Sequence, residues 1–437
     1  MKKNVFQAGE KVSRRDFIRS TAAVSLGVLA FDGSRIYAAG SDKLRVGLVG
    51  CGGRGTGAAL DCIKASPNVE ITAMGDMFSD RADKCLAKLS READDKVSVT
   101  KDTCFTGFDA YQKVLACDID MVIFATPPHF RPMHLKAAVE AGKHVFMEKP
   151  VAVDPVGVKS VIASSELAAS KGLAIVAGTQ RRHQANYLEI MKRIHNGDIG
   201  EIKAAQCYWN QGALWVKDAE KNFKLKESLG WSDMEYQCRT WLFFTWLSGD
   251  HIVEQHVHNI DVVNWAFGSH PVQCLGMGGR QVRTGPEYGN IFDHFAVEYE
   301  YPNGARVLSM CRQIEGCSNS VSERIIGTRG QAYTDGSNGR IDGEKAYKHE
   351  GKSPSPYVQE HADLIESIRQ GKPLNEGKRV AESTMTAIMG RMSAYTGRAL
   401  KWDWAMEASK LDLTPPSYAF GELPAMPVAV PGKTPLI

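Results

Sequence analysis

Short apolar runs alternate with longer amphipathic segments over the first 180 residues of the chain. The runs predict buried strands, and the segments between them predict helices. The predicted strands are residues 44–50, 69–74, 97–100, 119–125, 144–147 and 173–178, and the predicted helices are residues 56–65, 80–92, 111–115, 132–141 and 155–171. This alternation is typical of an α/β fold with a doubly wound parallel sheet, which we expect over residues 41–178.

The pattern changes in the second half, where strand-like runs follow one another with few helices between them. The predicted strands here are residues 202–209, 272–277, 293–301, 305–312 and 322–327, and the predicted helices are 187–196, 357–370 and 378–397. The tetrapeptide Y-P-N-G at residues 301–304 is a hairpin turn signal between two of these strands. We therefore expect an α+β domain with a mostly antiparallel, open sheet over residues 179–405.

Two segments of this half have weaker patterns. Residues 211–230 are charged and weakly periodic, and this predicts a loop or a lid. Residues 406–437 are rich in proline and predict a tail that wraps the surface or is partly disordered.

The first forty residues have the order of an export signal. Basic residues come first, then S-R-R-D-F-I at residues 13–18, an apolar stretch at 21–31 and small residues at 38–39. The paired arginines resemble the twin-arginine type of signal. A membrane-spanning helix needs about 20 apolar residues, so this stretch is too short. We predict that residues 1–40 are an export signal, with a short buried helix as the alternative, and that the mature protein is periplasmic without a membrane span.

Composition narrows the function classes. The formal net charge is +3, and no concentrated basic patch is present, so we expect no nucleic-acid partner. The ten cysteines form no zinc-like C-x-x-C pairs, and most of them are interpreted as small buried apolar residues.

A glycine motif follows the first predicted strand. Gly50, Gly52 and Gly55 form G-x-G-x-x-G between a strand and a helix, the context in which this motif indicates dinucleotide binding. The first glycine permits a tight turn, the second lets the backbone approach a pyrophosphate, and the third lets the helix pack on the strand. We therefore expect an N-terminal Rossmann domain.

The next strand ends at Asp76, at the spacing of the acid that binds the ribose 2′-hydroxyl. A carboxylate there repels a 2′-phosphate, so NAD is favoured, while Arg54 and Arg81 leave NADP possible. The predicted cofactor contacts in this region are Gly50, Gly52, Gly53, Arg54, Gly55 and Asp76.

Two further motifs extend the argument: A-T-P-P-H at residues 125–129 and A-G-K-H-V-F-M-E-K-P at residues 141–150. Together with the glycine motif, in this order and spacing, they closely resemble the Gfo/Idh/MocA oxidoreductase family over about residues 44–400. The resemblance implies an NAD(P)-dependent enzyme that moves hydride between a sugar or polyol hydroxyl and the nicotinamide. It also implies that the cofactor is contacted by Thr126, Pro127, His129, Glu148 and Lys149.

The resemblance also suggests the catalytic groups. Lys149 would contact the nicotinamide side and the substrate hydroxyl, where an ammonium stabilises a developing oxyanion. The segment at residues 248–265 resembles a family motif whose catalytic base maps onto His258 and whose partner acid maps onto Glu254, where the family usually has aspartate. On one continuous helix these two residues share a face, so we expect Glu254 to raise the basicity of His258. Asp261 would orient His258 or complete the packing.

One alternative concerns metal binding. His251, Glu254 and His258 would also share a helix face, which permits a metal site, although the spacing is not the H-E-x-x-H of zinc enzymes. No metal is expected on balance, and His256 has no assigned role.

The substrate side is less defined. Arg182 lies in a Q-R-R-H segment that resembles a family segment lining the active cleft, and Trp209 belongs to a group of aromatic residues suited to the apolar faces of sugar rings. The predicted substrate-binding residues are Arg182, Trp209, His258 and Asp261.

Three functions stay open. The leading one is a carbohydrate dehydrogenase. The second is a redox-neutral glycosidase or lyase that uses NAD transiently, and the third is a non-catalytic sugar- or nucleotide-binding protein. Because a periplasm offers no exchangeable NAD, we expect a tightly held cofactor. The resemblance further implies a homo-oligomer, a dimer or a tetramer.

Overall fold

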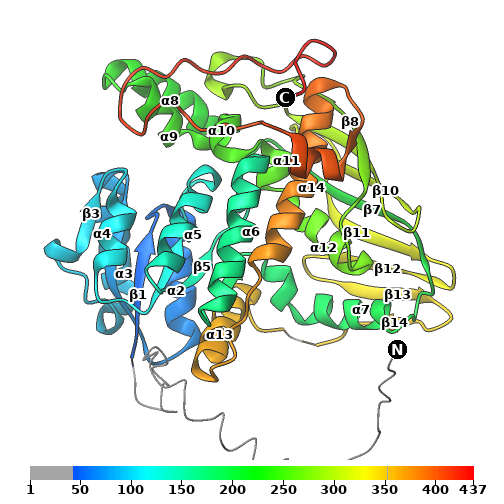
Figure 1. Cartoon of the computed structure of the whole chain (residues 1–437), viewed down its shortest axis with the longest axis horizontal. Helices are drawn as coiled ribbons and strands as arrows, with labels where there is room; N and C mark the ends of the chain where they lie inside the picture. The colour runs from blue at the N-terminus through cyan, green and yellow to red at the C-terminus, as the bar shows by residue number, and fades with distance from the viewer. Residues whose placement is uncertain (1–42, 352) are drawn as a thin grey trace, which may run out of the picture. The chain divides into compact units, whose positions relative to one another are not determined.

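The computed structural model describes residues 43–351 and 353–437 (Figure 1). The predicted export signal over residues 1–40 lies outside the described residues. The first sheet has six parallel strands in the order β3-β2-β1-β4-β5-β6, as expected for a doubly wound sheet. Its strands are β1 (Leu44–Val49), β2 (Val69–Asp76), β3 (Cys104–Thr106), β4 (Met121–Phe124), β5 (His144–Met147) and β6 (Ile175–Ala177).

Helices connect these strands and cover both faces of the sheet. They are α2 (Gly53–Ala65), α3 (Ser79–Ala93), α4 (Ala110–Ala116), α5 (Arg131–Glu140) and α6 (Pro155–Ser170). Every residue of β4 is buried, and so are Val145, Phe146 and Met147 of β5, which accounts for the uninterrupted apolar runs in the sequence.

The third strand is shifted from its predicted position, so the expectation of a strand at residues 97–100 is wrong. Val97 makes only an isolated bridge to Ile71. The extended run then ends in a turn, because the Thr103 hydroxyl oxygen accepts a hydrogen bond from the Thr100 amide at 2.9 Å. The strand proper is β3, whose Cys104 pairs with Met74 of β2.

The second sheet has nine strands in the order β14-β13-β12-β11-β7-β10-β9-β8-β15. All neighbouring pairs are antiparallel except β10 with β7, so the predicted antiparallel character is confirmed. The predicted turn at residues 301–304 joins β9 to β10. The strands are β7 (Ile202–Gln211), β8 (Gln273–Gly279), β9 (His294–Glu300), β10 (Arg306–Gln313), β11 (Ser320–Gly327), β12 (Gly330–Asp335), β13 (Gly339–Gly343), β14 (Tyr347–Lys348) and β15 (Leu400–Lys401).

Helices pack on one face of this second sheet. They are α7 (Ala185–His195), α12 (Val257–Phe267) and α14 (Gly377–Thr396). The helix α14 also packs along α6 of the first sheet, and Figure 1 shows these two helices side by side. A further helix, α13 (Pro356–Arg369), lies against α2. These contacts hold the carboxyl ends of the first sheet's strands next to α12.

The segment predicted as a loop or lid is largely helical, and this corrects the prediction of a loop. Residues 211–230 contain α8 (Val216–Ser228), in which only Ala219 is buried. A helix that buries so little has almost no apolar stripe, which is why its period was not visible in the sequence. It is followed by α9 (Asp233–Arg239) and the short turn η5 (Trp241–Phe243).

The C-terminal tail has no strand and runs along α9, where the amide of Met234 donates a hydrogen bond to the Gly421 carbonyl at 3.1 Å. All ten cysteines lie in the described part of the chain and are free, and seven of them are buried, as the composition suggested. No helix among the described residues is long and apolar enough to cross a membrane.

A buried histidine with two carboxylate partners makes stability depend on pH. His183 lies 2.5 Å from an Asp363 carboxylate oxygen and 3.5 Å from one of Glu376. Burial alone lowers the pKa of His183, but the hydrogen bonds to Asp363 and Glu376 outweigh it and raise the pKa to about 9. Since this is above the ordinary value of 6.5, the stabilisation is complete below pH 6.5 and is lost as pH rises through 9.

We predict that the free energy of unfolding falls by up to about 3 kcal/mol between pH 6.5 and pH 9.5 because of His183. The variant His183→Gln should show a clearly flatter dependence over the same window. Urea unfolding at both pH values measures this, and equal pH dependence in the two proteins would contradict the assignment.

Candidate active site

A cavity of about 1070 Å³ lies at the carboxyl ends of the first sheet's strands and is closed on its other side by the second half of the chain. This is the position at which α/β sheets bind their ligands. The predicted residues that line it are Gly50, Gly52, Gly53, Arg54, Gly55, Asp76, Thr126, Pro127, Glu148, Lys149, Trp209, Glu254 and His258. The lining does not include His129, Arg182 or Asp261.

The glycine loop has the geometry that its motif predicts. Gly50 has a φ of +97°, and a Cβ there would lie 2.6 Å from the backbone carbon of Ala125. A Cβ on Gly55 would lie 1.8 Å from the Gly50 carbonyl oxygen. A Cβ on Gly52 would meet nothing within 4 Å, so the backbone there is open to the cavity at the start of α2. This open, positively polarised helix start fits a pyrophosphate.

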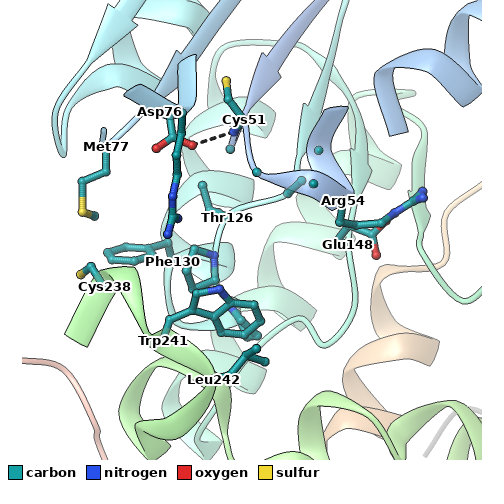
Figure 2. A pocket seen from close by; sticks show the side chains of 18 of the residues that line it. Cys51, Arg54, Asp76, Met77, Thr126, Phe130, Glu148, Cys238, Trp241 and Leu242 are labelled. Atoms are coloured by element: carbon teal, nitrogen blue, oxygen red, sulfur yellow. Dashed lines mark hydrogen bonds and ion pairs between the residues drawn. The ribbon is translucent and has the colours of Figure 1, made fainter. Parts of the chain in front are cut away.

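Asp76 is held in place by the loop that it faces. Its Oδ2 accepts a hydrogen bond from the Cys51 amide at 2.7 Å, drawn in Figure 2, and its Oδ1 accepts one from the Phe78 amide at 2.9 Å. Burial raises the pKa of Asp76, while these two hydrogen bonds oppose that shift. Each oxygen keeps a second lone pair, so the carboxylate can still accept ribose hydroxyls.

Arg54 stands at the centre of a cluster of acids. It forms ion pairs with Glu148, Asp61 and Glu360. Burial, followed by the nearby Glu148, raises the pKa of the fully buried Glu360 well above its ordinary value. The guanidinium also lies 5.0 Å from the ring centre of Tyr357, another residue that lines the cavity. Glu360 and Tyr357 come from α13, some 300 residues away, and no local motif marked them.

Lys149 reaches across the cavity to the second half of the chain. Its Nζ donates to the Glu254 carbonyl oxygen at 2.6 Å and lies 3.2 Å from the Glu254 carboxylate. Both side chains are about nine-tenths buried. The peptide bond between Lys149 and Pro150 is cis.

The expected pairing of Glu254 with His258 on one helix face is therefore wrong. The segment is not one helix: α11 (His251–Glu254) ends before α12 begins at Val257. The Glu254 carboxylate faces Lys149 instead. Between the two helices, the Nε2 of buried His256 lies 2.7 Å from the Ser309 hydroxyl oxygen, a contact to β10 that sequence spacing could not show.

His258 is less basic than predicted. Burial, followed by the charges of Lys149 and Arg181, holds its pKa well below the ordinary value, so the imidazole is neutral. Its ring stacks on Trp209 with centres 5.6 Å apart, and Arg181 lies over the same tryptophan. The Nδ1 atom has no hydrogen-bond partner among the described residues. A neutral imidazole beside an ammonium group can accept a proton from a bound hydroxyl.

Other predicted residues form pairs away from the lining. The Arg182 Nε donates to Asp261 at 2.8 Å, and Asp261 also accepts from Ser383, so this aspartate holds packing together rather than orienting His258. The His129 Nε2 lies 2.8 Å from the Tyr418 hydroxyl.

The metal alternative finds no support in the arrangement of His251, Glu254 and His258. Across residues 43–351 and 353–437, no group of three or more His, Cys, Asp or Glu side chains is placed to hold a metal ion.

The sequence analysis missed a buried carboxylate that supports His258. Glu323 on β11 is fully buried and accepts hydrogen bonds from Arg181, Tyr187, Asn259 and Thr334. Asn259 follows His258 on α12, and Arg181 lies over Trp209, so this carboxylate anchors both neighbours of the imidazole. The sequence did contain a signal for this residue. Glu323 lies within the predicted strand at residues 322–327, on the strand face that packs against the helices and is otherwise apolar.

The cavity thus combines a dinucleotide loop, a ribose acid, a lysine and a neutral histidine, the class of site that nicotinamide-dependent oxidoreductases have. Comparison with known protein families supports this assignment in both halves of the chain. Residues 44–179 match the oxidoreductase family with an NAD-binding Rossmann fold, and residues 187–333 match the GFO/IDH/MocA C-terminal domain. The chain belongs to the Gfo/Idh/MocA oxidoreductase family.

Similar proteins include inositol 2-dehydrogenase 4 of Saccharopolyspora erythraea, 30% identical over 165 residues, which are 38% of this chain. Another is the 2,7-anhydro-N-acetylneuraminate hydratase of Escherichia coli, 28% identical over 190 residues, which are 43% of this chain. The chain spans 45% and 44% of the length of these two relatives.

A solved structure with the same fold is levoglucosan dehydrogenase in complex with NADH and levoglucosan. It matches with a TM-score of 0.66 at 17% identity and covers 82% of this chain and 99% of its own.

We predict that Glu323→Gln lowers the free energy of unfolding by about 3 kcal/mol, because it leaves the Arg181 guanidinium buried without its counter-charge. The matched control is Glu298→Gln, which removes an exposed partner of Arg306 and should cost less than about 1 kcal/mol. Equal unfolding midpoints in urea for the two variants would contradict the role given to Glu323.

Proposed function

We propose that this protein is an NAD(P)-dependent oxidoreductase that transfers hydride between a CH–OH group of a sugar or polyol and a nicotinamide cofactor. One observation carries the proposal: Lys149 and His258 line the same cavity as the glycine loop and Asp76. The groups that would handle a substrate proton therefore lie beside the groups that would hold a dinucleotide. The dehydrogenase names among the relatives support a polyol or sugar substrate.

Each residue of the site has a distinct role in this reaction. A bound nicotinamide would supply the hydride acceptor. His258, kept neutral by burial, takes the proton from the substrate hydroxyl. Lys149, positioned by Glu254, stabilises the negative charge that develops on the oxygen. The Trp209 ring, which is partly exposed in the cavity, offers an apolar face to a sugar ring.

We propose NAD as the cofactor. Asp76 is fixed by two backbone amides at the end of β2 and would repel a 2′-phosphate. Basic residues on the same side of the cavity favour anionic groups and keep NADP open: Arg81, Lys84 and Lys88. Direct comparison of the two dinucleotides by calorimetry would decide this.

A redox-neutral reaction is the second candidate, and the similarity to a hydratase favours it. Such a reaction would use the same oxidation of a ring hydroxyl, followed by elimination and return of the hydride. The two candidates differ in one readout, since only the dehydrogenase accumulates NADH. A non-catalytic binding protein would bind sugar and dinucleotide without either change.

Export and a retained cofactor also belong to this proposal. The twin-arginine pattern at residues 13–18 supports a periplasmic location. A protein of this kind would acquire its dinucleotide before export, because no exchangeable pool exists outside the cytoplasm. Its cofactor would then be recycled by a second substrate or within a redox-neutral cycle.

We predict that His258→Ala and Lys149→Ala each lower kcat by roughly 10²–10⁴-fold while NAD binding persists, since both groups act on the substrate proton and oxygen. The measurement is NADH formation at 340 nm with a panel of inositols and sugars. The control is His195→Ala, an exposed histidine on α7 outside the cavity, which should retain full activity. Unchanged kcat in His258→Ala would contradict the assignment of the base.

A homo-oligomer is proposed from the uncovered face of the second sheet. On β8, Cys274 is buried toward the helices, so the alternate residues point to the opposite face. Leu275 and Met277 are 54% and 72% exposed there, and Leu308 of β10 is 39% exposed. An apolar sheet face of this kind is suited to pairing with a second copy.

We predict that the wild-type protein sediments as a dimer or tetramer and that the double variant Leu275→Lys with Met277→Lys shifts it toward the monomer. The control is Leu229→Lys, an equally exposed leucine after α8, which should leave the sedimentation coefficient unchanged. A monomeric wild-type protein would contradict the proposal.

A further inference from the structure

The second half of the chain supplies one wall of the cavity near the end of β2. Residues 238–243, from the end of α9 through η5, line the cavity together with Asp76 and Met77. Figure 2 shows Cys238, Trp241 and Leu242 across the cavity from these two residues. A dinucleotide that used Asp76 for its ribose would therefore lie between two walls rather than on an open surface.

Arg239 connects this wall to the loop after β2 and to the first turn of α3. The Arg239 Nη1 lies 3.1 Å from an Asp80 carboxylate oxygen, and its guanidinium lies 3.9 Å from the ring centre of Phe78. The Arg239 carbonyl oxygen also accepts a hydrogen bond from Arg81 at 3.2 Å. Phe78 in turn donates its amide to Asp76. The contacts of Arg239 thus end on the residues next to the predicted ribose acid.

The C-terminal tail reaches the same point. The Phe420 ring stacks with Phe78 at 5.8 Å between centres and 8° between planes. The residues that follow are attached to α9. The Gly421 carbonyl oxygen accepts a hydrogen bond from the Met234 amide, and the side-chain amide of Gln237 donates one to the Leu423 carbonyl oxygen at 2.5 Å. The tail is therefore attached to α9 and rests on the same phenylalanine.

We infer that residues 231–243 and 411–423, here called the cover, close the dinucleotide site and control the release of the cofactor, and that Arg239 is the residue that keeps the cover closed. The inference rests on the proposed function, because it assumes that the cavity binds NAD(H). For the dinucleotide to leave, the cover has to separate from Phe78 and Asp80. A partly exposed ion pair with Asp80 and a cation–π contact with Phe78 oppose that separation.

Release of the cofactor, rather than turnover, is the quantity that this role changes. Arg239 lines the cavity at its Asp76 end, and its ion pairs and ring contacts are with Asp80, Glu235, Phe78 and Trp231, so we expect its loss to act on the binding and release of the cofactor. We expect Arg239→Ala to raise the dissociation rate of NADH by roughly tenfold or more, since a contact worth about 1.4 kcal/mol corresponds to one factor of ten. Phe420→Ala should act in the same direction, because it removes the contact of the tail with Phe78.

The chain contains a closely matched control. Arg193 on α7 pairs with Glu189 at 2.9 Å, lies 3.4 Å from Asp198 and stands 3.7 Å from the ring centre of Tyr347. Arg239 likewise pairs with the glutamate four residues earlier, Glu235 at 2.9 Å, with an aspartate and with an aromatic ring, and it lies in addition 4.7 Å from the ring centre of Trp231. Since Arg193 is outside the cavity lining, Arg193→Ala removes an equivalent set of contacts without touching the cover.

The experiment measures NADH release from the full-length protein by stopped-flow fluorescence, with excess NAD as the trap. Faster release in Arg239→Ala and Phe420→Ala, with the wild-type rate in Arg193→Ala, supports the inference. Wild-type release rates in all three variants overturn it, and so does rapid release from the wild-type protein.

If Arg239→Ala does not fold, as judged by circular dichroism, Asp80→Asn carries the same test. If the wild-type protein binds no dinucleotide at all, the proposed function itself is wrong. This outcome is distinguishable from unchanged release rates in the variants, which overturn only the role of the cover.

Discussion

The contact between Lys149 and Glu254 is the interaction on which the site depends. The lysine follows a strand of the first sheet, and the glutamate ends the short helix that precedes His258. The contact therefore places two groups that handle a proton beside a loop that holds a dinucleotide. Packing of α14 along α6 keeps the two halves in this relation, and the side chains of Lys149 and Glu254 are about nine-tenths buried. Burial, followed by the charge of this ammonium, holds the pKa of the neighbouring His258 well below its ordinary value.

Several charged side chains in and near the cavity have a partner of opposite sign. Arg54 has Glu148, Arg181 has Glu323, and Arg182 has Asp261. Such pairs add little net stability, because removing each ion from water costs nearly as much as the pair returns. They do restrict the arrangement, since any other packing would leave a charge unpaired. Of these pairs, Arg181 with Glu323 contacts Trp209 and Asn259, and we interpret it as the pair that fixes Trp209 and His258 in position.

The cavity also differs in character between its two ends. Near His258 it is lined by polar and charged side chains that suit proton transfer. Near Asp76 it is closed by aromatic and cationic contacts from α9 and the tail. Under the proposed function, the Asp76 end would hold the adenosine half of the dinucleotide and the His258 end the nicotinamide half.

The sequence by itself determined the parallel sheet, the glycine loop and the position of Asp76. These features depend on local periodicity and on backbone conformations such as the positive φ of Gly50, so neighbouring residues suffice to specify them. The helical pattern of residues 216–228 was hidden, because that helix buries almost nothing. Only the tertiary structure decided that Glu254 pairs with Lys149 instead of His258, and that Glu323 and Glu360 complete the site. Those pairings join side chains a hundred or more residues apart, or depend on a break between two short helices, and no local pattern records which distant charge a buried group will meet.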